Sequence, residues 1–109
     1  MAFCEVLAQR VRDLLYPLTT AEEKKMFGGI AFMVKGNMTV AVIRDELIAR
    51  VGLKNYEAAL DKPGTNLFQP TGKPMAGWVT VAPDSHQADE NLKYWIELAL
   101  AFVKTLPAK

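Results

Sequence analysis

Cysteine and histidine are almost missing from this chain, and that scarcity excludes several classes of protein. Among its 109 residues there are one cysteine, Cys4, and one histidine, His86. A single cysteine forms no internal disulfide, and this pair gives no ligand spacing for a zinc site. No apolar run approaches the roughly 20 residues that span a bilayer. No secretory leader pattern opens the chain. We therefore expect a cytoplasmic protein without a membrane segment.

An excess of charge of either sign is missing as well. The sequence has 13 basic and 12 acidic residues, a formal net charge of +1. No run of lysine or arginine exceeds two residues, at Lys24-Lys25. Because nucleic-acid-binding domains carry a basic footprint, we do not expect direct nucleic-acid binding. Hydrophobic residues make up 50% and charged residues 23%, which is ordinary globular usage and predicts one domain over residues 1–109.

Hydrophobic periodicity predicts helices at both ends of the chain and a short one between them. Residues 2–16 and 53–61 show helical spacing, and Pro17 ends the first of these segments. Residues 87–105 carry the clearest apolar stripe. Its members are Leu92, Trp95, Ile96, Ala99, Phe102, Val103 and Leu106.

The middle of the chain is rich in residues that favour strands. Residues 24–34, 38–43 and 46–51 are joined by short turns, which predicts an antiparallel meander, and 78–81 predicts a later strand. The pair Gly28-Gly29 inside the first run indicates a bulge, a sharp bend or a close backbone approach. The predicted fold class is therefore α+β: an antiparallel sheet, a three-strand meander plus a later strand, with the N-terminal and C-terminal helices packed on it.

The residues that could carry chemistry are isolated from one another. His86 follows Asp84 and Ser85, which predicts a solvated loop histidine at a helix start. Cys4 is expected to be a small, half-buried residue at the start of the first helix. Gly28-Gly29 lacks the spacing of a phosphate-binding loop. We therefore expect no catalytic residues, no metal site, no cofactor and no enzymatic activity.

Two features indicate a contact surface. The loop that ends at Trp78 combines a cation, Lys73, with Met75, and predicts either a recognition surface or a rigid crossover loop whose apolar side chains plug the core. Arg50 and Tyr56 complete the candidate surface, and Arg50, Lys73 and Tyr56 would serve anion recognition if the ligand were a small molecule. In the last helix a flanking stripe indicates either an embedded helix or a partner contact, such as a homodimer. That stripe consists of Tyr94, Leu98 and Ala101.

Four blocks of the sequence resemble, in order and in spacing, the TfoX N-terminal domain family. The first is residues 25–33, which contain the motif Met26-Phe27-Gly28-Gly29. The second and third are residues 47–52 and 72–78, and the fourth is the last helix, centred on Trp95 and ending in Leu106-Pro107. Together the blocks cover nearly the whole chain.

The resemblance implies a function as well as an α+β fold. The family is named after the competence regulators TfoX, also called Sxy, which help the cyclic-AMP receptor protein to switch on DNA-uptake genes. They are regulators without known enzymatic activity, and their N-terminal domain acts through protein contacts. The resemblance thus implies a non-enzymatic protein-interaction module in transcriptional regulation. The named regulators also have a second, C-terminal helical domain, whereas we expect a single-domain relative here. The alternative is a domain that binds a small anionic ligand, or an unrecognised enzyme.

Overall fold

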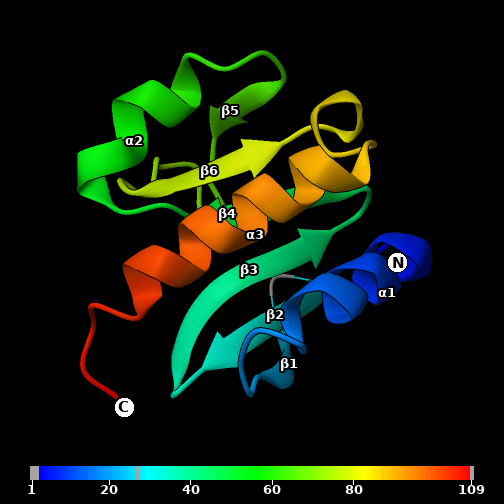
Figure 1. Ribbon diagram of the computed structural model, residues 1–109. Coiled ribbons are helices and arrows are strands. Elements are labelled where there is room, and N and C mark those ends of the chain that lie inside the picture. The colour runs from blue at the N-terminus through cyan, green and yellow to red at the C-terminus, as the bar shows by residue number, and fades with distance from the viewer. Residues whose placement is uncertain (1–2, 27, 109) are drawn as a thin grey trace.

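The computed structural model describes residues 3–26 and 28–108 and has an α+β architecture (Figure 1). The three helices of this described part pack with one six-stranded sheet. The helices are α1 (Glu5–Leu15), α2 (Leu53–Leu60) and α3 (Asp89–Val103), and a short 3-10 turn, η1 (Pro83–Ser85), precedes α3. The strands are β1 (Glu22–Met26), β2 (Gly29–Val34), β3 (Asn37–Ile43), β4 (Glu46–Arg50), β5 (Thr65–Leu67) and β6 (Trp78–Val81).

The sheet is antiparallel throughout, in the order β1-β2-β3-β4-β6-β5. The fold class is confirmed, but the expected three-strand meander is wrong in one respect. Residues 24–34 do not form one bent strand: β1 ends at Met26, β2 begins at Gly29, and these two residues pair with each other. Gly28 lies in the reversal with a φ of +75°, which glycine adopts without a steric cost. Phe27 lies outside the described residues.

Gly29 bears out the expected close approach of two backbones. A Cβ atom built on it would overlap the carbonyl oxygen of Val42 on the neighbouring strand β3. Residues 65–77 are punctuated by proline and glycine, and the sequence predicts a loop in which Leu67 and Phe68 could contribute a short edge strand. That edge strand is present as β5, which spans three residues, ends at Leu67 and pairs with β6 at the edge of the sheet.

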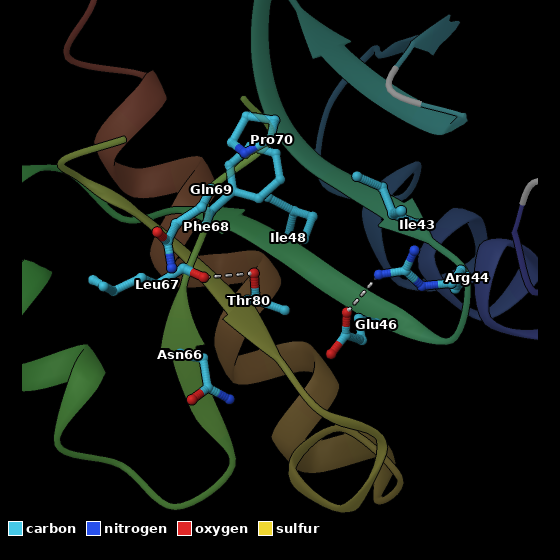
Figure 2. Close-up of a pocket in the computed structure, with 10 residues that line it drawn as sticks. All are labelled: Ile43, Arg44, Glu46, Ile48, Asn66, Leu67, Phe68, Gln69, Pro70 and Thr80. Atoms are coloured by element: carbon cyan, nitrogen blue, oxygen red, sulfur yellow. Dashed lines mark hydrogen bonds and ion pairs between the residues drawn. The ribbon is translucent and has the colours of Figure 1, made fainter. Parts of the chain in front are cut away.

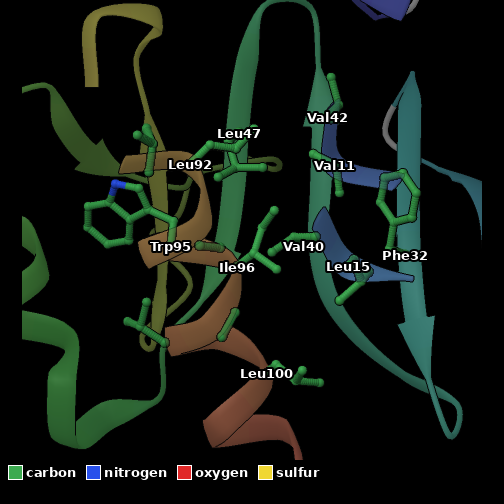
Figure 3. Packing of buried hydrophobic residues seen from close by; sticks show 14 of the residues in the cluster. Val11, Leu15, Phe32, Val40, Val42, Leu47, Leu92, Trp95, Ile96 and Leu100 are labelled. Atoms are coloured by element: carbon green, nitrogen blue, oxygen red, sulfur yellow. The ribbon is translucent and has the colours of Figure 1, made fainter. Parts of the chain in front are cut away.

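The main core lies between the sheet and the helices α1 and α3, which lie over the same face of the sheet (Figures 1 and 3). Alternate strand residues point into it, because successive side chains of a strand face opposite sides. We call this cluster the helix-side core. Its most deeply buried members include Val11, Leu15, Phe32, Val40, Val42, Leu47, Leu92 and Ile96. Within the described residues, no helix is both long enough and apolar enough to cross a membrane.

The opposite face of the sheet carries a second, smaller apolar cluster. Its buried members are Ala31, Met38, Ala41, Ile48 and Phe68. We call this side the open face. The chain between β5 and β6 returns over it, so that Met75 and Trp78 pack against the cluster as half-buried residues. The predicted recognition loop, which ends at Trp78, therefore lies against the open face of the sheet.

Candidate functional site

Arg50, at the end of β4, lies over two aromatic rings. It pairs with Trp78 across β4 and β6, and its guanidinium carbon lies 5.0 Å from the centroid of the Trp78 ring. The ring of Phe102, near the end of α3, lies 5.6 Å from the same carbon. Both distances are within the range of a cation–π interaction. Arg50 sits where the strand ends, so rings from two different elements reach it.

Arg50 has no acidic partner within the described residues. The chain has four arginines, and the other three each form an ion pair: Arg10 with Asp89, Arg12 with Glu23, and Arg44 with Glu46. Neither an ion pair nor a hydrogen bond is formed by the Arg50 side chain in the described part of the chain. Burial lowers the pKa of Arg50, because a partly desolvated cation loses hydration. An arginine nevertheless remains charged at neutral pH.

The two rings and Arg50 form part of a groove of about 300 Å³. We call it the Arg50 groove. Arg50 is the only charged side chain among the described residues that line it. Leu53, the first residue of α2, stands at its rim with 71% of its surface exposed. The lining residues are Arg50, Gly52, Leu53, Ala76, Gly77, Trp78 and Phe102.

Backbone hydrogen bonds fix the floor of the Arg50 groove. The N–H groups of Val51 and Gly52 both donate to the carbonyl oxygen of Gly77, at 2.8 and 3.0 Å. Gly52 has a φ of +86°, and a Cβ atom there would overlap the Phe102 ring. The turn after β4, the loop before β6 and the last helix are therefore packed tightly against one another at this point.

The structure brings some of the predicted site residues together and separates others. Arg50 and Trp78 are in contact, and the N–H of Trp78 donates to the carbonyl oxygen of Met75 at 3.1 Å. Tyr56 instead packs against the helix-side core, so it does not line the Arg50 groove. Lys73 is exposed and does not line the groove either. The predicted set of Arg50, Lys73 and Tyr56 therefore does not converge on this groove.

Sequence reasoning missed Gly52, Leu53 and Phe102 as parts of this site. Phe102 belongs to the apolar stripe of α3, and its helical spacing marks it as a core residue. It is only half-buried, because it lies at the end of the helix beside the groove. Leu53 could have been predicted to lie near Arg50, because it follows the turn at Arg50-Val51-Gly52 directly and is the first residue of a helix.

A second, larger hollow lies on the open face (Figure 2). Its volume is about 560 Å³, and we call it the Arg44 pocket. Polar and apolar residues both line it, and the charge of the lining is balanced, since Arg44 and Glu46 approach each other at 3.9 Å. The hydroxyl of Thr80 donates to the carbonyl oxygen of Leu67 at 3.4 Å. The lining residues are Ile43, Arg44, Glu46, Ile48, Asn66, Leu67, Phe68, Gln69, Pro70 and Thr80.

His86 is not the solvated loop residue that the sequence predicts. Only 5% of its surface is exposed, and its Nε2 atom lies 2.9 Å from the carbonyl oxygen of Asp45 in the turn between β3 and β4.

Cys4 is half-buried at the start of α1, as expected, where its Sγ accepts a hydrogen bond from the N–H of Leu7. Within residues 3–26 and 28–108, no three side chains of histidine, cysteine, aspartate or glutamate are grouped closely enough to hold a metal ion.

Of the motif Met26-Phe27-Gly28-Gly29, the described residues Met26, Gly28 and Gly29 do not line the Arg50 groove. In the described residues, Met26 packs against the open-face cluster, and Gly28 and Gly29 make the reversal between β1 and β2. The motif therefore shapes the first hairpin of the sheet rather than the groove.

Comparison with protein families identifies the family of this chain. The model of the TfoX N-terminal domain family matches residues 13–103, which is most of the chain. Comparison with curated proteins and with solved structures gives no significant match. The matched range contains the whole sheet and both rings that flank Arg50. The chain therefore belongs to the TfoX N-terminal domain family.

Proposed function

We propose that this domain is a non-enzymatic protein-interaction module, and that the Arg50 groove is its contact surface. The observation that carries this proposal is the partly buried Arg50, which has no acidic partner within the described residues. Arginine and tryptophan are the residues most enriched at energetically important positions of interfaces. Here they are in contact at the base of an open groove.

Exposed apolar surface beside Arg50 supports the same proposal. Leu53 is one of the two most exposed large hydrophobic residues of the described chain, and it stands at the rim of the groove. An apolar rim around a single cation offers a partner both buried area and one directional contact. A homodimer through α3 has less support, because Leu98 packs on the helix-side core and Tyr94 stacks edge-on against Trp95.

The environment of His86 supports a role without catalysis. A general base must present a free nitrogen to a substrate. The Nε2 atom of His86 is engaged with the backbone of Asp45, and its Nδ1 atom is buried. His86 lines neither the Arg50 groove nor the Arg44 pocket.

For the biological setting we propose transcriptional regulation. The TfoX N-terminal domain family is linked to competence regulation, and a regulator of that kind needs a docking surface on a transcription protein. We expect the partner to be a transcription factor or a subunit of RNA polymerase.

Affinity capture from the native cytoplasm tests this proposal, with mass spectrometry, a nuclease control and washes at low and high salt. We expect a transcription protein to be retained by the wild type and lost with Arg50→Glu. Lys93→Glu is the control. Lys93 lies on α3, where it pairs with Glu97 at 3.9 Å, and it does not line the groove. Thermal unfolding of each variant checks the fold. Equal retention by Arg50→Glu and the wild type would overturn the proposal.

The Arg44 pocket favours a second candidate function, the binding of a small molecule. A volume of about 560 Å³ falls within the range of ligand pockets. A thermal-shift screen of small organic acids tests this candidate. A ligand whose stabilisation is lost in Arg44→Gln but kept in Arg50→Gln would support it, and a screen without such a ligand would count against it.

A further inference from the structure

We infer that the Arg50 groove recognises one carboxylate that stands next to an apolar side chain, in an acidic segment of the partner protein. This inference rests on the proposed function and specifies the chemistry of the contact. The groove offers one cation and an otherwise apolar lining. Its complement is therefore a group with one negative charge and an apolar neighbour.

The surroundings of the Arg50 guanidinium favour a carboxylate as its ligand. The centroids of the Trp78 and Phe102 rings lie 5.0 and 5.6 Å from its central carbon. Its N–H donors have no acceptor within the described residues. Such a planar set of donors matches a carboxylate, which accepts two parallel hydrogen bonds. The rings restrict the movement of the guanidinium, so less entropy is lost when the acceptor binds.

The charge balance of the groove argues for a single negative charge rather than a phosphate. No second cation lines the groove among the described residues. A phosphate near neutral pH carries close to two negative charges, and proteins usually meet it with several cations. One arginine balances one carboxylate. The ion pair gains strength because the rings already exclude part of the water around Arg50.

The lining and the size of the groove argue for an apolar neighbour on a peptide. Leu53 and Trp78 line the same groove as Arg50 and offer apolar surface there. The volume of about 300 Å³ lies at the lower end of the range for ligand pockets. That space suits one or two side chains of an extended segment, with the rest of the partner lying outside the groove.

Titration of the 15N-labelled domain with two blocked tripeptides tests the inference by NMR. The peptides are acetyl-Leu-Glu-Phe-amide and acetyl-Leu-Gln-Phe-amide, so the only charge in either is the glutamate carboxylate. We expect the first to shift the amide resonances of Leu53 and Gly77 and the indole resonance of Trp78 in a saturable manner. The glutamine peptide should bind about tenfold more weakly, as expected for the loss of a charged hydrogen-bonded pair.

Two variants tie the effect to Arg50. Arg50→Gln should bring binding of the glutamate peptide down to that of the glutamine peptide. Lys62→Gln is the matched control, because Lys62 is also a cation over a ring, 4.9 Å from the centroid of Tyr94, but lies outside the groove. It should bind like the wild type. Amide spectra of both variants show directly whether they are folded.

Three results would overturn the inference: equal affinity for the two peptides, unchanged binding by Arg50→Gln, or shifts at residues outside the groove. A further titration uses 4-methylpentanoate, a free acid with the side chain of leucine. If it bound as tightly as the glutamate peptide, the groove would be a site for small acids, and the peptide inference would be wrong. If Arg50→Glu abolished partner capture while the two peptides bound equally, the proposed function would stand and this inference alone would fall.

Discussion

Arg50 and Trp78 face each other across β4 and β6, and the guanidinium carbon of Arg50 lies 5.0 Å from the centroid of the Trp78 ring. Directly opposite residues of an antiparallel pair are the unit of interaction in a sheet. Here the pair also forms the wall of a groove, because β4 ends at Arg50 and β6 begins at Trp78. The same contact therefore contributes to stability and shapes the candidate site.

Replacing Trp78 by alanine should destabilise the domain and leave Phe102 as the only ring at Arg50. Trp78 is half-buried and also packs against Phe68, with ring centroids 6.2 Å apart. We expect Trp78→Ala to lower the free energy of unfolding by about 2 kcal/mol, below the range for fully buried tryptophans. Urea unfolding measures it. Trp78→Phe, which keeps a ring, should cost less than about 1 kcal/mol. A cost of Trp78→Ala near zero would contradict the packing described for this residue.

Gly52→Ala should disturb the groove more than its backbone conformation alone requires. Gly52 and Gly72 have similar φ angles, +86° and +89°. A Cβ atom at position 52 would overlap the Phe102 ring, whereas nothing lies within 4 Å of one at position 72. We expect Gly72→Ala to cost about 1 kcal/mol from the left-handed conformation. Gly52→Ala should cost about 1–3 kcal/mol more, because the ring must move and because the ψ of 161° at Gly52 places its backbone in a region that essentially only glycine adopts. Equal losses of unfolding free energy would show that Phe102 does not pack on Gly52.

Low pH should weaken the hydrogen-bonded ion pair that joins Arg12 of α1 to Glu23 of β1. Arg12 donates to both carboxylate oxygens of Glu23, at 2.7 and 2.9 Å, and the hydroxyl of Tyr16 also donates to it. The hydrogen bonds from Arg12 hold the pKa of Glu23 below its usual value. Since the pKa is lower in the folded state, this stabilisation is fully present above the unfolded value of about 4.3 and is lost as the pH falls through the lowered one.

The measurement is the free energy of unfolding of the wild type and of Glu23→Gln at several pH values. We expect a difference of roughly 0.5–1 kcal/mol at pH 7 that persists to about pH 5 and shrinks at lower pH. Glu22→Gln is the control, since Glu22 forms no ion pair within the described residues. A difference for Glu23→Gln that stayed constant down to about pH 2 would rule out this linkage.

Arg10 should matter more to stability than its ion-pair partner does. Its Nη2 atom donates to the carbonyl oxygens of His86 and Gln87, at 2.9 Å each, and to Asp89 at 3.0 Å. Asp89 is exposed, with 82% of its side-chain surface accessible, so the ion pair itself contributes little. We expect Arg10→Met to cost about 1–2 kcal/mol, through the lost contacts to the backbone. Asp89→Asn should cost less than about 0.5 kcal/mol. Equal costs in thermal unfolding would show that the ion pair dominates.

The elements with a regular local pattern could be predicted from the sequence. The apolar stripe of α3 repeats at helical spacing, and Leu92, Trp95 and Ile96 are buried as predicted. The short turn predicted between residues 24–34 and 38–43 is also confirmed, with φ angles of +53° at Lys35 and +82° at Gly36. In both cases the deciding physics is local: the spacing of side chains along a helix, and the tolerance of turn residues for positive φ.

The first hairpin could not be settled in this way. A glycine pair in a β-rich run is compatible with a bulge and with a reversal of the chain, and only the pairing of β1 with β2 distinguishes them. His86 shows the same limit. Its polar neighbours predict exposure, but the turn at Asp45, far away in the sequence, buries the ring.

The candidate site is partly visible in the sequence. Arg50 and Trp78 were predicted to share a surface, and the register of β4 and β6 brings them into contact. Phe102 could not be assigned to it, because its helical spacing indicates core packing and nothing local shows that α3 ends beside β4. That Arg50, Met75 and Trp78 touch a partner stays a prediction, as do the roles expected for Lys73 and Tyr56.

Site-specific photo-crosslinking from the rim of the groove tests the central claim most directly. Leu53 and Val6 are equally exposed, at 71% each, but only Leu53 lines the Arg50 groove. A benzoylphenylalanine at position 53 should give one dominant crosslinked protein in the native cells. That product should disappear when Arg50→Gln is added, and the same probe at position 6 should not give it. A product that formed equally from both positions, or that survived Arg50→Gln, would contradict the account.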